Sequence, residues 1–127
     1  MNILEKIDKV LNEDIINLDT QVAKFLTGAQ KIVDDYNTKN FPKQGTKLVI
    51  KKGPKYYKII AKSIFDGKVN ENSGFVWAFI NVISGDIFKA ASFNAPAKGA
   101  RGNINDEFGG LKGVTPYGPK YLRGGNY

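Results

Sequence analysis

The chain has 127 residues, of which 42% are hydrophobic and 24% are charged, and this is typical of one globular domain with a buried core. It contains no cysteine and no histidine, which excludes disulfides, thiolate chemistry, and the commonest zinc ligand and general base. No apolar run approaches the ~18 residues of a membrane span, and the N-terminus mixes acids with bases, so we expect neither a transmembrane helix nor a signal peptide.

The formal net charge of +7 is distributed unevenly. Residues 1–38 hold seven acids and four lysines, whereas residues 39–70 hold nine lysines against Asp66 alone. Residues 89–127 hold six cations and two acids. Basic charge gathered in one region favours a polyanion partner. The alternative is that these lysines are solvated residues that protect strand edges from aggregation.

Apolar residues at spacings of three and four predict helices over residues 2–12 and 18–36. The second stripe comprises Leu18, Val22, Phe25, Leu26, Ala29, Ile32, Val33 and Tyr36. Asn17 would cap the second helix, unless the two helices are one. Gly28 either weakens this helix by about 1 kcal/mol relative to alanine or allows close packing. We expect the stripe to pack on the chain's own sheet, and a coiled-coil or assembly contact is the alternative.

A polar loop is predicted next, followed by a series of strands. The loop covers residues 37–45, the strands cover 46–51, 56–65 and 75–82, and a return strand covers 87–91. Gly53-Pro54 is a turn pair between the first two strands. Alternation in 75–82 places Phe75, Trp77 and Phe79 on one face. This strand is apolar on both faces, so we expect it to be covered on both.

These elements predict a single α+β domain over residues 1–127. Its helical part, residues 1–40, packs on a small antiparallel sheet. The remainder, residues 46–127, contains that sheet and then a glycine-rich basic C-terminal region. Short pieces around 110–114 and 117–122 are the parts of this region that we expect to pack.

The C-terminal half carries a set of short motifs. In order they are Ala78-Phe79-Ile80, Ser84-Gly85-Asp86-Ile87, Lys89–Ser92, Ala95–Asn103 and the run from Pro116 to Arg123. This set resembles a family of small uncharacterised proteins of tailed bacteriophages with the pattern KAAS…APAKxxRGN…PYGxxYLR. The likeness extends from Lys55 onward. It implies a phage origin, and with it the host cytoplasm or the virion as location, but no catalytic residue.

The segment Ala95–Asn103 places Lys98 and Arg101 three residues apart among small side chains. Such a segment can form a backbone anion nest, or a helical turn capped by Ser92 or Asn94. In either form Arg101 could hold a phosphate through its planar fork while Lys98 adds a point charge. The alternative is a structural brace in which Arg101 pairs with a carboxylate: Asp86, Asp106 or Glu107.

Aromatic residues alternate with cations along the basic part of the chain, a combination that suits single-stranded nucleic acid or nucleotides. The candidate nucleic-acid or phosphate contacts are Lys89, Lys98, Arg101, Asn103, Lys120, Arg123, Tyr56 and Tyr57. Tyr56 and Tyr57 lie on opposite faces of their strand, so we expect one exposed ring. We expect Trp77 and Phe93 to be buried.

No pair of acids is marked as a metal or catalytic site, so we expect a protein that is not an enzyme and holds no cofactor or metal. The leading hypothesis is a non-catalytic phage protein that contacts nucleic acid or phosphate groups through a basic surface. A virion structural or assembly protein is the alternative, and a host-defence antagonist that sequesters nucleotides is a further one. The partners expected are nucleic acid or a nucleotide, other phage proteins and further copies of the chain, but no membrane.

Overall fold

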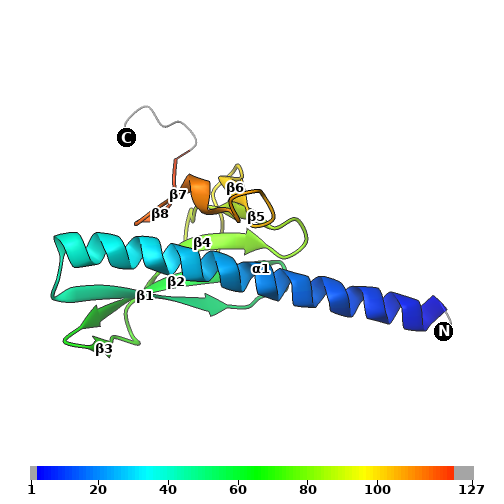
Figure 1. Cartoon of the computed structure of the whole chain (residues 1–127), viewed down its shortest axis with the longest axis horizontal. Coiled ribbons are helices and arrows are strands. Elements are labelled where there is room, and N and C mark those ends of the chain that lie inside the picture. Colours follow the sequence, from blue (N-terminus) through cyan, green and yellow to red (C-terminus); the bar gives the residue numbers. More distant parts are fainter. Residues whose placement is uncertain (1–2, 122–127) are drawn as a thin grey trace.

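The computed structural model of the chain describes the backbone of residues 3–121 and the side chains of residues 17–121. One long helix, α1 (Ile3–Asn40), is followed by a mostly antiparallel sheet, so the α+β class is confirmed (Figure 1). The sheet has the order β1-β2-β4-β5-β6, with β3 pairing only with β2. Its strands are β1 (Gln44–Lys51), β2 (Tyr56–Phe65), β3 (Lys68–Val69), β4 (Phe75–Asn81), β5 (Asp86–Phe88) and β6 (Gly102–Asn103). A short 3-10 helix η1 (Leu111–Gly113) and the pair β7 (Val114–Thr115) and β8 (Gly118–Pro119) follow.

The helix is continuous, so of the two alternatives left open by the sequence the single helix is the one found, and Asn17 lies inside α1 and does not cap a second helix. Residues 12–17 contain neither glycine nor proline, and nothing in them therefore interrupts the helical hydrogen bonds. With 38 residues, α1 is about 57 Å long by the rise of an ideal helix. Its N-terminal part extends beyond the sheet (Figure 1). The predicted apolar side chains of residues 3–11 lie outside the described side chains.

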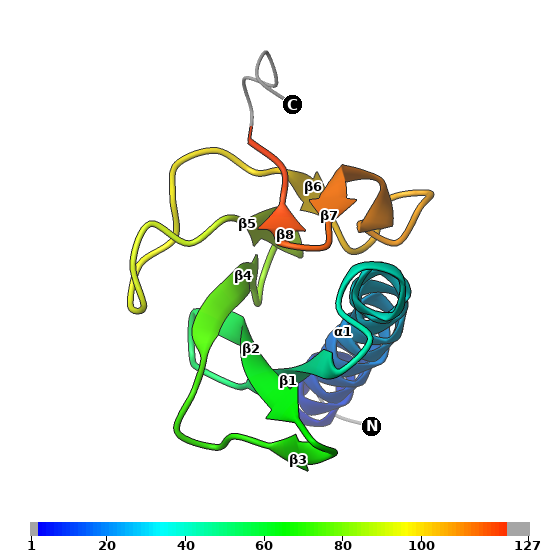
Figure 2. The same cartoon turned by 90° about the vertical axis from the view of Figure 1, so that its left-hand side faces the viewer.

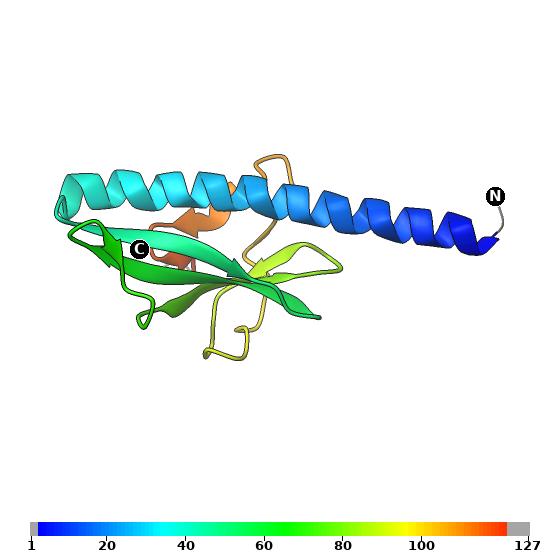
Figure 3. The ribbon, with the colours of Figure 1, turned by 90° about the horizontal axis from the view of Figure 1, so that it is seen from below.

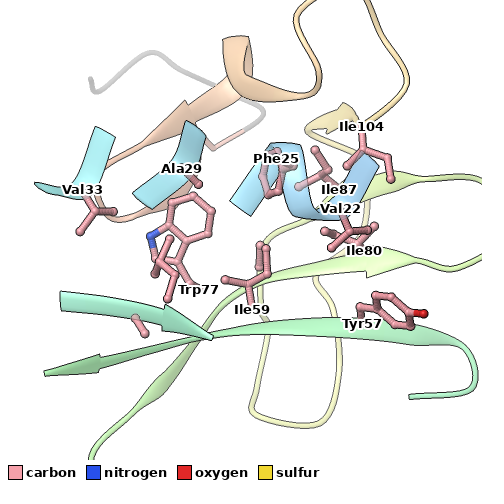
Figure 4. Close-up of a cluster of buried hydrophobic side chains, with 13 residues drawn as sticks. Val22, Phe25, Ala29, Val33, Tyr57, Ile59, Trp77, Ile80, Ile87 and Ile104 are labelled. Atoms are coloured by element: carbon pink, nitrogen blue, oxygen red, sulfur yellow. The ribbon is translucent and has the colours of Figure 1, made fainter. Parts of the chain in front are cut away.

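The apolar stripe of α1 packs on one face of the sheet, as the spacing predicted. Val22, Phe25, Ala29 and Val33 are all buried in one cluster with side chains from the strands (Figure 4). The ring of Phe25 lies 6.2 Å from that of Trp77, and such aromatic pairs contribute beyond the area they bury. Gly28 faces Leu111 so closely that a Cβ would collide with its side chain, so close packing explains this glycine.

The helix also protects the outer edge of the sheet. The side-chain amide of Gln30 donates to the carbonyl of Thr46 at 2.7 Å and accepts from the N–H of Leu48 at 2.8 Å. These two contacts reproduce the pairing that a neighbouring strand would give. Because exposed strand edges invite pairing with other chains, Gln30 shields part of β1 from that risk.

A β-bulge in β4 changes the face to which its side chains point. Ile59 lies opposite Ala78 but Ile60 lies opposite Val76, so Trp77 is the extra residue. Trp77 packs in the core against α1, while Phe79 contacts Tyr56 on the other face. The prediction that Trp77 and Phe79 share a face was therefore wrong, because the bulge interrupts the alternation.

The predicted strand boundaries fit best at the centre of the sheet. Strand β2 matches the predicted range, whereas β1 begins two residues earlier and β4 ends one residue earlier. The helix continues to Asn40, so the polar loop is shorter than predicted. The return strand ends at Phe88, after which Ala90 makes a single bridge to Pro96.

The C-terminal pieces pack against both α1 and β4. The indole N–H of Trp77 donates to the carbonyl of Pro116 at 3.3 Å. The hydroxyls of Tyr36 and Tyr117 share a hydrogen bond between the end of α1 and the β7–β8 turn. Neither helix in the described part of the chain is long and apolar enough to span a membrane.

If α1 is held by this core, Phe25→Ala should lower the free energy of unfolding by about 3–5 kcal/mol, because it leaves a cavity against Trp77. Urea denaturation measures the change. Lys24→Ala, on the exposed side of α1, serves as the control and should stay within about 0.5 kcal/mol of wild type. A Phe25→Ala protein with normal stability but a smaller oligomer would instead favour an assembly contact.

Candidate functional site

Lysine and aromatic side chains form one row across four strands on the face of the sheet opposite α1, here called the far face. In the strand register Lys51 lies opposite Lys58, Lys58 opposite Phe79, and Phe79 opposite Phe88. Directly opposed residues in antiparallel strands share a face. The register therefore gathers two ammonium groups and two rings that are far apart in the sequence.

The two adjacent tyrosines of β2 divide between the faces, as predicted. Tyr56 lies on the far face, where its ring meets the rings of Phe79 and Phe88 edge-on at 5.7 and 6.1 Å. Tyr57 is only 8% exposed and packs under α1. Its hydroxyl donates to the Asp19 carboxylate at 2.8 Å. Tyr57 is therefore a core residue, and only Tyr56 faces the far side.

A pocket of about 380 Å³ opens on the far face beside the β1–β2 turn. Four lysines line it: Lys51, Lys52, Lys55 and Lys58. The other side chains are those of Pro54, Tyr56, Phe79 and Asn94, with Gly53 in the turn. Phe79 is almost fully buried, so its ring forms part of an apolar floor beneath the ammonium groups.

The lysine side chains are held by rings and by oxygen atoms. The Lys58 ammonium donates to the Asn94 side-chain carbonyl at 3.3 Å and lies 4.4 Å from the ring centre of Phe93. The Lys55 ammonium lies 5.5 Å from the ring centre of Tyr56. Cation–π contacts of this kind orient an ammonium without neutralising it.

The segment after β5 runs on the side of the sheet away from α1 (Figures 2 and 3). Its Asn94 lines the pocket. The segment folds back on itself, because the carbonyl of Ala95 accepts from the N–H groups of Ala91 and Ser92 at 2.9 and 3.1 Å. Residues 95–103 contain no helical turn, so that alternative for the segment is absent. Phe93, at the tip, is 49% exposed and lies over Lys58, so the prediction that it is a core residue was wrong.

Arg101 braces the C-terminal segments, but through carbonyl groups rather than the predicted carboxylates. Its Nε donates to the carbonyl of Gly99 at 3.0 Å, and its two terminal nitrogens donate to the carbonyls of Lys120 at 3.0 Å and Lys98 at 3.2 Å. A glycine-rich loop without regular pairing leaves such carbonyls in need of donors. The guanidinium joins three of them.

The other predicted contacts also lie away from the pocket. Asn103 donates to the carbonyl of Ser84 at 2.8 Å and to the Asp86 carboxylate at 3.0 Å. The Lys89 ammonium lies 4.3 Å from the Tyr121 ring centre. Burial first, and then the charge of Arg101, lower the pKa of Lys89. Lys98 and Lys120 are exposed, and Arg123 is outside the described residues.

Sequence reasoning overlooked most of the pocket. Lys51 and Lys52 were not singled out, Asn94 was considered only as a helix cap, and Lys55 and Lys58 counted only among the cations that alternate with aromatic residues. The nine lysines within residues 39–70 were the available signal. The number of lysines does not show which of them share a face, because the strand pairing decides that.

A three-residue contact anchors the back of the turn to α1. Asp19 accepts from Tyr57 at 2.8 Å and pairs with the Lys52 ammonium at 3.1 Å. The hydrogen bond from Tyr57, and then the contact with Lys52, lower the pKa of Asp19. Burial, and then the bond to Asp19, raise the pKa of Tyr57.

Taken together, the fold and the pocket define a small α+β protein with a cationic, aromatic-floored site on one sheet face. The chain belongs to the Family of unknown function (DUF7717), whose profile matches residues 3–111 and so includes α1 and the whole pocket. No curated protein and no solved structure matches the chain.

The Asp19 contact should make stability depend on pH at both ends of the scale. The lowered pKa of Asp19 contributes stability above its ordinary value of 3.8, which is lost as the pH falls. The raised pKa of Tyr57 contributes stability below its ordinary value of 10.0, which is lost as the pH rises through the folded-state pKa. Tyr57→Phe should therefore flatten both limbs of the free energy of unfolding, measured by urea denaturation against pH. Tyr56→Phe should keep the wild-type profile, and equal profiles for all three proteins would contradict this account.

If Arg101 is a brace, Arg101→Ala should lower the free energy of unfolding by about 1–2 kcal/mol, because three carbonyls lose a charged donor. Arg101→Lys should recover little of this, since one ammonium cannot replace the planar fork. Thermal and urea unfolding measure the effect. Lys43→Ala, in the turn before β1, is the control. If Arg101→Ala leaves the midpoints of thermal and urea unfolding unchanged but weakens nucleic-acid binding, the phosphate-binding interpretation of Arg101 would be restored.

Proposed function

We propose that this protein binds single-stranded nucleic acid without catalysis, through the lysines and rings of its far face. The observation that supports this most is the row of Lys51, Lys58, Phe79 and Phe88 together with the pocket that the first three of them line. Ammonium groups neutralise phosphates along a strand, and the accessible parts of rings beside them accept bases of any sequence. The helix covers the opposite face, so the far face is the one on which a strand would lie.

The charge of the site suits a polyanion better than a catalytic role. The described residues that line the pocket include four lysines and no carboxylate. Phe93, half exposed at the tip of the segment after β5, adds a ring next to the Lys58 ammonium. We assign the phosphate contacts to Lys51, Lys55 and Lys58, and the base contacts to Tyr56 and Phe93.

The glycine-rich basic C-terminal region has a supporting role in this proposal. Lys98 and Lys120 are exposed and lie on segments that Arg101 joins. They extend the basic surface, whereas Arg101 and Asn103 hold its backbone. A phage origin, with the protein in the host cytoplasm or the virion, belongs to the same proposal.

A second candidate is a virion structural or assembly protein, with other phage proteins or further copies of the chain as partners. One observation favours it: the N-terminal part of α1 extends beyond the sheet (Figures 1 and 3). A helix that leaves its own sheet has backbone length available for contact with another subunit. Size determination in solution separates the candidates, since a large defined oligomer favours assembly and a monomer favours strand binding.

Fluorescence anisotropy with a labelled oligothymidylate of about 12 nucleotides tests the main proposal. We expect micromolar or tighter affinity at low salt. The logarithm of the affinity should fall with the logarithm of salt concentration, by about 0.7 for each phosphate contacted. Lys58→Gln should weaken binding about fivefold to tenfold and make the salt slope shallower, because one counterion-releasing contact is lost.

Lys31→Gln is the matched control, because Lys31 is an exposed lysine on α1 that pairs with Asp35 at 3.1 Å. Its removal changes the net charge equally but leaves the far face intact. Equal losses in the two variants would show that net charge alone drives binding. Absence of salt-dependent binding in the wild-type protein would refute the proposed function.

A further inference from the structure

We infer that the pocket holds one nucleotide that carries a terminal phosphate, either as a free nucleotide or as the 5′ end of a strand. This inference rests on the proposed function, because it assigns the phosphate-binding chemistry of the far face to one pocket. It goes beyond that function by distinguishing a terminal phosphate from the internal phosphates of a chain.

The size of the pocket is the first argument. At about 380 Å³ it lies near the lower end of the roughly 300–1,000 Å³ found for small-molecule sites. A site of this size accepts a ligand the size of one nucleotide, not several in succession. Lys51, Lys58 and Phe79 belong both to the row and to the pocket, so a nucleotide in the pocket would lie at one end of the row.

The charge of the pocket is the second argument. Among the ion pairs of the described residues, Lys52 is the one pocket lysine with a carboxylate partner, Asp19. Lys51, Lys55 and Lys58 keep their charge for a ligand. An internal phosphodiester brings one negative charge, whereas a terminal phosphate brings about 1.5 to 2 at pH 7 and adds an acceptor oxygen. Three pocket lysines without a carboxylate partner among the ion pairs of the described residues match the terminal group better.

The rigidity of the walls is the third argument. A Cβ on Gly53 would lie 2.7 Å from the carbonyl oxygen of Tyr56, so only glycine fits this turn without a shift of the backbone. The carbonyl of Lys55 accepts from the N–H of Val82 at 3.0 Å, which ties the turn to the end of β4. A turn whose backbone is held before binding loses less entropy when the ligand arrives.

The floor of the pocket explains why the ligand should carry a base. The edge-on contacts of Tyr56 with Phe79 and Phe88 fix its ring as a rigid apolar wall below the lysines. Inorganic phosphate would use the ammonium groups but not this wall. A nucleotide would use both, with its base and sugar on the rings and its phosphate at the rim.

The test compares one oligothymidylate of about 12 nucleotides in two forms, with a 5′-phosphate and with a 5′-hydroxyl. We expect the 5′-phosphorylated form to bind about tenfold more tightly, the gain expected from one added hydrogen bond to a charged group. Lys55→Gln should abolish this preference, whereas Lys98→Gln, a lysine outside the pocket, should retain it. Equal affinity of the two forms, with normal salt dependence, would overturn the inference and leave the proposed function intact.

Competition and calorimetry with thymidine 5′-monophosphate, thymidine and inorganic phosphate identify the source of the ligand. Displacement of the 5′-phosphorylated strand by the monophosphate, and not by thymidine or phosphate alone, supports a free nucleotide as ligand. Failure of the monophosphate to compete, with the 5′-phosphate preference retained, supports a strand end. Binding of the monophosphate without binding of any strand would refute the proposed function but would support the nucleotide site in the pocket. Absence of binding by every probe would overturn both.

Discussion

The packing of α1 on one face of the sheet is the contact on which the other features of this protein depend. Val22, Phe25 and Val33 bury one face of the central strands, and Gln30 occupies part of the β1 edge. With one face and part of one edge covered, the far face is where a large ligand can approach the sheet. The lysines of β1 and β2 gather on that face because the register pairs them there. The residues that alternate with them along each strand point to the other face and pack in the core.

The bulge at Trp77 lets one strand serve both the core and the site. Strict alternation would place Trp77 and Phe79 on the same face, so either the core would lose its largest side chain or the far face would lose the floor of its pocket. One extra residue in β4 separates them. Trp77 then meets Phe25, and Phe79 meets Tyr56 and Lys58. The same irregularity therefore sets the core packing and the pocket chemistry.

Local patterns in the sequence were sufficient to predict the stripe of α1, the bounds of β2 and the turn at Gly53-Pro54. They failed where a distant contact decides the outcome. The bulge at Trp77 leaves no mark in a run of apolar residues, and the pairing of Lys58 with Asn94 joins side chains 36 positions apart. The most conspicuous cation, Arg101, satisfies three carbonyls of an irregular loop. An arginine between glycines looks the same in sequence whether its partner is a phosphate or the chain's own backbone.

The motif around Lys89–Asn103 is best understood as the support of the pocket rather than as its contact surface. Its small residues allow the segment to fold back, with Ala97 donating to the carbonyl of Lys89 at 2.8 Å, and its tip presents Phe93 and Asn94 to Lys58. Arg101 holds the base of the same segment to the C-terminal strands. A change in the brace would therefore move Asn94 without touching a ligand. Loss of binding in an Arg101 variant is evidence of contact only when the fold around Asn94 is unchanged, so stability and binding have to be measured on the same variant.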